Sequence, residues 1–340
     1  MRKALITGIN GQDGAYLAKV LLEKGYEVYG LARRSSTQGD WRLKRLNVKN
    51  DIKVVECDLT EFFQIFNIIK SIEPDEIYNL AAQSFVGYSF DNPINTLNVD
   101  GAAVLYLLES IRILNPKIKF YQASTSEMFG KVQAIPQVED TPFYPRSPYG
   151  VAKLYGHWIT KNYRESYNIF ASSGILFNHE SPLRGAEFVT RKITYGIAQI
   201  QAGDIQYIEV GNMDAKRDWG FAGDYVLGMH LMLQAKEPDD YVLATNRTHT
   251  IRYMIEQAFK AVDVEIKWQG TSDNEVGIDA KTGTARIKVN PKFYRPAEVE
   301  LLVGNPVKAK TKLGWEPQMS FESLIKYMVE EDLKYYCFNS

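Results

Sequence analysis

The sequence predicts an α/β fold with a doubly wound parallel sheet and a smaller, interleaved C-terminal α/β lobe. From the first residues, short apolar runs alternate with amphipathic segments, a pattern typical of parallel sheets covered by helices. After about residue 178 the alternation loosens, and no repeat or low-complexity linker interrupts the chain. We therefore expect residues 1–178 to form mainly the sheet domain and 179–340 mainly the second lobe, with some later segments returning to the sheet.

The individual elements follow from the apolar spacing. The expected strands are Lys3–Gly8, Glu27–Arg33, Lys53–Asp58, Glu76–Ala82, Lys119–Ser124, Phe170–Phe177, Tyr241–Ala244 and Arg286–Val289. The expected helices include Gly14–Lys24, Thr60–Ile72, Arg191–Gln201 and Ala222–Leu233. The stretch Gly270–Gly283 is polar and has no periodicity, so we expect it to be a surface loop.

The composition argues against several classes of protein. A formal net charge of −1 provides no general attraction for nucleic acid. No apolar run reaches the roughly 18 residues of a membrane span. Two cysteines, Cys57 and Cys337, cannot form a disulfide framework and suit a cytoplasmic protein. No His, Cys and acid group has the spacing of zinc ligands, so we expect no metal.

A glycine-rich turn follows the first expected strand and precedes the first helix. Glycines allow a tight turn and close approach of a pyrophosphate, which the helix N-terminus attracts. The same glycines could form a merely structural turn, but their position is the one that a Rossmann-type dinucleotide site requires. We therefore expect a nicotinamide dinucleotide to bind Gly8, Asn10, Gly11, Gln12, Asp13 and Gly14.

The end of the second strand indicates which dinucleotide is bound. NAD enzymes usually carry an acid there, whereas this chain has Arg33 and Arg34 and no nearby carboxylate. A guanidinium pairs well with a 2′-phosphate, so we expect NADP and assign the contact to Arg33. A solvated basic turn or a subunit contact is the alternative. Asp58, which ends the third strand, is expected to meet the adenosine.

Tyr149 and Lys153 form the only Y-x-x-x-K pair of the chain. Residues four apart share one helix face, and a neighbouring ammonium lowers a tyrosine pKa. Such a pair carries little weight alone, but this one follows the fifth strand by about one strand-and-helix unit. We expect Tyr149 to act as the catalytic base and Lys153 to tune it.

Thr125, Ser126 and Glu127 end the fifth strand, where a doubly wound sheet faces its ligand. Thr125 could bond a substrate hydroxyl. Glu127 adds a carboxylate that a simple dehydrogenase does not need, which suggests proton chemistry coupled to hydride transfer. Alternatively, the three residues only cap the following turn.

Together these motifs resemble the GDP-mannose 4,6-dehydratase family of extended short-chain dehydrogenases/reductases, nearly end to end. The matching segments are 7–14, 32–36, 79–84, 120–127, 143–149, 176–182, 188–192, 217–220 and 294–299. Many sugar-nucleotide dehydratases have an acid at the position of Ser126. The GDP-mannose branch has a serine there, as this chain does. The resemblance implies NADP-dependent oxidation at sugar C4, loss of water across C5 and C6, and hydride return to C6, with Thr125, Glu127, Tyr149 and Lys153 as catalytic residues.

The resemblance also implies further binding residues. For the cofactor these are Leu59, Leu80, Ala82, Ser84, Tyr149, Lys153, His179 and Arg184. His179 is expected to be either structural or cofactor-facing. For the GDP-sugar they are Ser84, Ser126, Asn178, Val189, Arg191, Lys192, Gly211, Arg217, Arg295 and Glu298. Each of these arginines, taken alone, could equally be solvated or structural.

Other functions remain open at this point. The same dehydration could act on another GDP-sugar, such as GDP-D-glycero-manno-heptose. Glu127 beside Thr125 argues against a GDP-sugar reductase or epimerase, and the presence of Tyr149 and Lys153 argues against a non-catalytic NADP sensor. The resemblance further implies a homotetramer in which the turn after the second strand reaches a neighbour's cofactor, with a dimer as the alternative.

Overall fold

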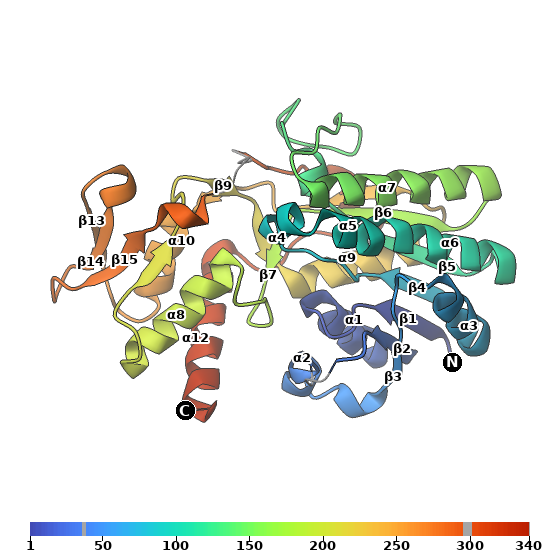
Figure 1. Ribbon diagram of the computed structural model, residues 1–340, viewed down its shortest axis with the longest axis horizontal. Helices are drawn as coiled ribbons and strands as arrows, with labels where there is room; N and C mark the ends of the chain where they lie inside the picture. Colours follow the sequence, from blue (N-terminus) through green and yellow to red (C-terminus); the bar gives the residue numbers. More distant parts are fainter. Residues whose placement is uncertain (36–38, 295–300, 340) are drawn as a thin grey trace.

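The computed structural model describes residues 1–35, 39–294 and 301–339 and centres on a seven-stranded parallel sheet (Figure 1). The strand order is β11-β6-β5-β4-β1-β2-β3. The strands are β1 (Lys3–Thr7), β2 (Glu27–Ala32), β3 (Ile52–Glu56), β4 (Glu76–Asn79), β5 (Lys119–Thr125), β6 (Ala171–Leu176) and β11 (Asp240–Leu243). All seven were predicted, although β4 ends before Ala82. The order reverses between β1 and β4, which places a ligand crevice at their carboxyl ends.

Helices cover both faces of this sheet. One face carries α3 (Phe62–Ile72), α6 (Ala103–Leu114) and α7 (Pro148–Tyr167). The other face carries α1 (Gln12–Glu23), α9 (Ala222–Gln234), α2 (Trp41–Arg45) and α11 (Val307–Leu313). Helix α1 buries Ala15, Ala18 and Leu21, which lie three residues apart and so face the sheet together.

The second lobe lies at the left of Figure 1 and packs three helices against a small sheet. The helices are α8 (Val189–Ala202), α10 (Ile251–Lys260) and α12 (Phe321–Asn339), and the sheet has the order β13-β14-β15-β8. Its strands are β13 (Ile266–Gln269), β14 (Val276–Asp279), β15 (Ala285–Val289) and β8 (Ile208–Val210). After β8 of the small sheet, the chain returns to the large sheet with α9 and β11, so the two lobes are interleaved.

The expectation of a surface loop over Gly270–Gly283 is wrong, because this stretch contains strand β14. β14 pairs with both β13 and β15 in an antiparallel arrangement. Its buried positions are Gly277 and Asp279, so the strand presents no large apolar side chain to the core. The alternation of Val276 and Ile278 with Gly277 and Asp279 spans only four residues, and its apolar members are only half-buried, so it gives a weak strand signal.

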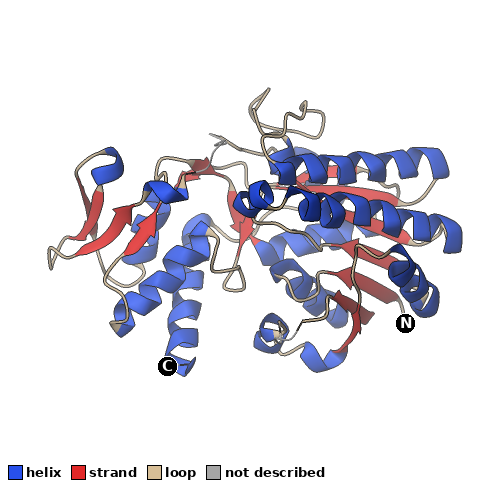
Figure 2. Ribbon diagram, viewed as in Figure 1, coloured by secondary structure: helices blue, strands red, loops and turns tan. Residues whose placement is uncertain are grey.

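Short elements complete the chain and connect the two lobes (Figure 2). The short strand pairs are β7 (Asn178–Glu180) with β10 (Trp219–Phe221), and β9 (Lys216–Arg217) with β12 (His249–Thr250). The short helices are α4 (Val86–Asp91), α5 (Pro93–Leu97), the π-helical turn η2 (Asn98–Ala102) and the 3-10 turns η1 (Lys49–Asp51), η3 (Ser126–Met128), η4 (Ser272–Asn274) and η5 (Pro291–Phe293). Within the described part of the chain, none of the helices is both long and apolar enough to cross a membrane.

Candidate active site

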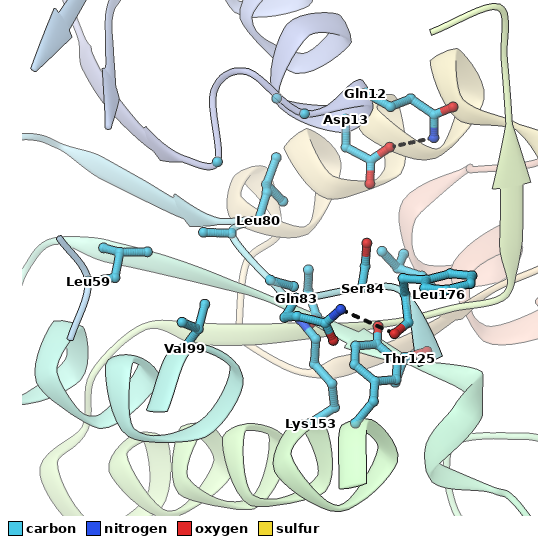
Figure 3. Close-up of a pocket in the computed structure, with 18 of the residues that line it drawn as sticks. Gln12, Asp13, Leu59, Leu80, Gln83, Ser84, Val99, Thr125, Lys153 and Leu176 are labelled. Atoms are coloured by element: carbon cyan, nitrogen blue, oxygen red, sulfur yellow. Dashed lines mark hydrogen bonds between the residues drawn. The ribbon is translucent and has the colours of Figure 1, made fainter. Parts of the chain in front are cut away.

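A cavity of about 760 Å³ lies over the carboxyl ends of the parallel strands (Figure 3). Its size is within the usual range for small-molecule and cofactor sites. It brings together most of the residues that we expected at the site. These are Gly8, Asn10, Gly11, Gln12, Asp13, Gly14, Arg33, Asp58, Leu59, Leu80, Ala82, Ser84, Thr125, Ser126, Glu127, Tyr149, Lys153, Asn178, His179 and Arg184.

The glycine turn has the geometry of a phosphate cradle. Gly8 has a positive φ of 70°, and a side chain there would place its Cβ 2.8 Å from the backbone of Ala81. A Cβ at Gly14 would lie 2.4 Å from the carbonyl oxygen of Gly8. None of the described side chains caps α1, which begins after Gly11, so its first N–H groups face the cavity without a side-chain partner from that part of the chain. This turn therefore fits a dinucleotide pyrophosphate.

Arg33 lies just past the end of β2 and lines the cavity, whereas Arg34 does not. Asp58, the nearest predicted acid, accepts hydrogen bonds from the N–H and hydroxyl of Thr60 at 2.9 and 2.8 Å. These bonds, with a smaller contribution from the charge of Arg33, lower the pKa of Asp58. The Asp58 carboxylate is thus ionised and already held by its own loop.

The catalytic candidates come from two adjoining elements. Ser147 caps α7 by accepting a hydrogen bond from Gly150 N–H at 3.0 Å, and Tyr149 and Lys153 follow on one face of that helix. Thr125 ends β5, and its hydroxyl accepts from Glu127 N–H at 3.3 Å. The end of the strand and the start of the helix thus place all four side chains on the cavity wall.

The electrostatics of Tyr149 differ from the sequence-based expectation. Burial, then the charge of Asp100, raises the pKa of Tyr149, and a hydrogen bond with Thr125 only partly offsets them. Lys153 lies with its Nζ 5.9 Å from the Tyr149 ring centre and donates to the Ala123 carbonyl at 3.1 Å. Burial also lowers the pKa of Lys153. An ionised Tyr149 therefore needs positive charge beyond what the neighbouring side chains supply.

Asp100 does not line the cavity, but its charge acts on Tyr149 and Lys153, and sequence reasoning missed it. It lies on the π-helical turn η2, is 1% exposed, and accepts a hydrogen bond from Gln83 N–H at 2.7 Å. Its second carboxylate oxygen has no partner among the residues that the structure describes. Burial raises the pKa of Asp100 to about 6, against an opposing effect of Lys153. In the sequence, Asp100 is an isolated acid before the apolar run of α6, and this is the signal by which it could have been found.

The expected GDP-sugar contacts are more dispersed. Lys192 lines a second hollow of about 450 Å³, where its Nζ lies 3.3 Å from the centre of the Phe293 ring. Val189 begins α8, Gly211 follows β8, and Arg217 is buried on β9, and none of these three lines either hollow. The predicted contacts Arg295 and Glu298 lie outside the described residues.

Arg191, an expected substrate contact, lies in an ion pair within the protein. Its side chain is 4% exposed and lines neither hollow. The guanidinium pairs with Asp332 of α12 at 2.8 Å and donates to the Arg184 carbonyl at 3.0 Å. Thr194 adds a 2.7 Å hydrogen bond to the same carboxylate. Arg191 therefore links α8 to α12 through its Nε group, and its Nη1 group is engaged by the Pro182 and Arg184 carbonyls.

Acidic and histidine side chains do not form a metal centre in the part of the chain that the structure describes. Across residues 1–35, 39–294 and 301–339, no three His, Cys, Asp or Glu side chains gather closely enough to hold an ion.

A family model described as GDP-mannose 4,6 dehydratase matches residues 5–328. The chain belongs to this family. Human GDP-mannose 4,6 dehydratase is 51% identical over 339 residues, which cover 97% of this chain and 91% of the human protein. The Yersinia enterocolitica GDP-mannose 4,6-dehydratase is 49% identical over 351 residues, covering 98% of this chain and 94% of that protein. The family resemblance inferred from the sequence is thus confirmed.

Solved structures confirm the fold class. UDP-glucose 4-epimerase from Thermotoga maritima superimposes with a TM-score of 0.83 at 22% identity, covering 98% of this chain and 99% of that one. dTDP-glucose 4,6-dehydratase from Bacillus anthracis gives a TM-score of 0.81 at 19% identity, covering 98% and 97%. RMD from Pseudomonas aeruginosa, complexed with NADPH, gives 0.77 at 20% identity, covering 98% and 100%.

Proposed function

We propose that this GDP-mannose 4,6-dehydratase family member converts GDP-D-mannose to GDP-4-keto-6-deoxy-D-mannose and water. The observation that carries the proposal is the convergence of Thr125, Glu127, Tyr149 and Lys153 on the cavity that also contains the glycine turn. The chain is 51% and 49% identical, over nearly its whole length, to two proteins named GDP-mannose 4,6-dehydratase, and this similarity supports the proposed substrate.

The side chains suit the order of events in this reaction. The glycine turn and Arg33 would hold a nicotinamide cofactor, which would supply a hydride acceptor for C4 and a hydride donor for C6. Thr125 orients the C4 hydroxyl, and Tyr149 takes its proton as the ketone forms. The ketone acidifies the proton on C5, which makes loss of the C6 hydroxyl feasible. Glu127 then serves as the acid and base of this elimination. Because hydride is returned, the reaction is redox-neutral overall.

The experiment is incubation of the purified protein with GDP-D-mannose and, separately, with GDP-D-glycero-manno-heptose. NMR should show a 4-keto, 6-deoxy sugar only from GDP-mannose, and dehydration of the heptose alone would overturn the proposed substrate.

Variants of the catalytic residues test the proposed roles. Tyr149→Phe should lower turnover by orders of magnitude while retaining bound NADP. In Glu127→Gln, reduced nicotinamide should accumulate, and its absorbance measures this accumulation. Tyr167→Phe, at the exposed end of the same helix, is the matched control.

We propose NADP as the cofactor. Arg33 offers a planar fork for a 2′-phosphate at the cavity rim, and Asp58 is held by Thr60 rather than by Arg33. Among proteins of similar fold, RMD was solved with NADPH and the dTDP-glucose dehydratase with NAD, and the first of these supports the proposal.

We propose that the protein is a homotetramer in which the turn after β2 reaches a neighbouring cofactor. Arg33 and Arg34 are exposed there, whereas Arg42 donates to the Leu183 and Asn10 carbonyls of its own chain at 2.6 and 3.0 Å. A separate exposed apolar surface, which a second copy would cover, lies on α4, α5 and α7. It consists of Tyr88, Phe90, Ile94, Leu97, Val151, Tyr155 and Trp158.

We also propose a cytoplasmic location. Cys57 is a buried free thiol, which suits a reducing compartment. Cell fractionation with an antibody to the chain tests this location.

A further inference from the structure

Asp13 and His179 form a buried pair between the first helix and strand β7. Asp13 lies in the first turn of α1 beside the phosphate cradle, and His179 lies on β7. His179 Nε2 lies 2.8 Å from the Asp13 carboxylate, and its Nδ1 lies 2.8 Å from the Phe177 carbonyl oxygen. Both side chains line the main cavity.

The two distances determine how many protons the pair holds. A carbonyl oxygen can only accept, so Nδ1 must carry a proton. The contact between Nε2 and Asp13 needs a second proton, on either the ring or the carboxyl group. Gln12 donates to the other Asp13 oxygen at 3.1 Å, which favours a carboxylate. The arrangement therefore corresponds to an imidazolium beside a carboxylate.

We propose that His179 is a positioning residue, protonated at neutral pH, which neutralises Asp13 where the pyrophosphate of the cofactor would bind. This inference rests on the proposed dinucleotide role of the glycine turn. An unpaired carboxylate one residue into α1 would repel the phosphates that the helix N-terminus attracts. The imidazolium removes that repulsion. Asp13 keeps its place in the first turn of α1, where its side chain lies beside that of Gln12 (Figure 3).

The charged groups around the pair support this state. Burial lowers the pKa of His179, but Asp13 and the Phe177 carbonyl together outweigh burial and Arg184, so the pKa is raised above 6.5. Burial raises the pKa of Asp13, but His179, Gln12 and Arg184 outweigh it, so that pKa is lowered below 3.8. From α9, the Tyr225 ring stacks on His179 at 4.7 Å, and burial keeps its hydroxyl neutral.

Three further groups interact electrostatically with Asp13. They are Arg42 on α2, Lys153 on α7 and Tyr121 on β5.

The direction of the pH effect follows from the raised pKa of His179 and the lowered pKa of Asp13. The pair contributes its full stabilisation between about pH 4 and 6.5, and loses it as pH rises through the folded pKa of His179. NADP binding should weaken over that upper range, because Asp13 then keeps an uncompensated charge.

The first experiment is an NMR titration of the full chain labelled with ¹⁵N-histidine. The chain has four histidines, which single His→Gln variants assign. We expect both His179 nitrogens to be protonated at pH 7, with titration above 6.5. Burial lowers the pKa of His157, His230 and His249, which should be neutral at that pH. A neutral His179 with an unprotonated Nε2 at pH 7, with or without a protonated Asp13, overturns the proposal.

The second experiment measures NADP affinity by calorimetry from pH 6 to 9. His179→Gln should weaken NADP by at least about tenfold at pH 7, the scale of one charge-assisted contact. Asp13→Asn in the same chain should recover most of that loss, and Asp13→Asn alone should remove the pH dependence. His230→Gln is the control, because this histidine lies on α9 and does not line the cavity.

Two outcomes would contradict the role in cofactor binding. One is an unchanged NADP affinity in folded His179→Gln, and the other is a double variant no better than the single one. Failure of the unmodified chain to bind any nicotinamide dinucleotide would instead overturn the proposed cofactor, and the NMR titration would still test the protonation of His179.

Discussion

Asp100 is a single residue whose charge acts on both Tyr149 and Lys153. Asp100→Asn keeps an oxygen that can accept from Gln83 N–H but removes the charge. Since that charge raises the pKa of Tyr149, its removal should move the acidic limb of the kcat/KM profile to lower pH. The pH profile of the variant measures this shift. Asp91→Asn, an exposed change on α4, is the control. An unshifted acidic limb would separate Asp100 from the base.

Arg33 permits a second prediction at the residue scale. A charge-assisted contact to a 2′-phosphate contributes about 1.5–3 kcal/mol, which corresponds to roughly 10- to 150-fold preference for NADP over NAD. Arg33→Ala should remove most of this preference, and the difference between the two proteins should shrink at high salt. Calorimetry with each dinucleotide measures it. Arg34→Ala should have a smaller effect, because Arg34 does not line the cavity. Equal affinities in the unmodified chain would refute the role of Arg33.

At the scale of elements, the ion pair between Arg191 and Asp332 joins α8 to α12. Arg191→Met would leave a fully buried carboxylate without its cation, which costs about 3–5 kcal/mol. The loss should be larger at pH 8 than at pH 5, because burial already raises the pKa of Asp332 and a protonated carboxyl needs no cation. Denaturant unfolding at both pH values measures the effect.

A control separates this structural role from substrate binding. Adding Asp332→Leu to Arg191→Met should recover much of the stability, since both partners are then apolar. If folded Arg191→Met keeps its stability but loses affinity for the GDP-sugar, the structural assignment of Arg191 is wrong.

At the scale of the whole molecule, the exposed apolar surface on α4, α5 and α7 predicts assembly. Ile94 is 76% exposed and Trp158 is 51% exposed, although both are large apolar residues. Replacing both by Lys should convert the proposed tetramer into smaller species, because the charges would be buried in the subunit contact. Light scattering measures the mass, and Phe63→Lys, at an exposed apolar residue of α3, is the control. An unmodified chain that is monomeric with full activity would contradict the tetramer.

The sequence by itself determined the parallel sheet, the position of the glycine turn and the family. These features depend on local patterns: apolar runs for β1 to β6, glycines where the backbone must turn at Gly8, and matching motifs along most of the chain. Twenty of the expected site residues line one cavity, because the carboxyl ends of parallel strands meet at one edge of the sheet.

Only the tertiary structure decided the roles that depend on partners distant in sequence. Arg191 is paired with Asp332, 141 residues away, so its motif alone could not distinguish a substrate contact from an ion pair. Asp13 meets His179 across 166 residues, and Asp100 meets Gln83 through a turn that no pattern predicted. β14 was hidden because Gly277 and Asp279 form its buried face. Burial and charge pairing set these protonation states and roles, and both arise only when the chain is folded.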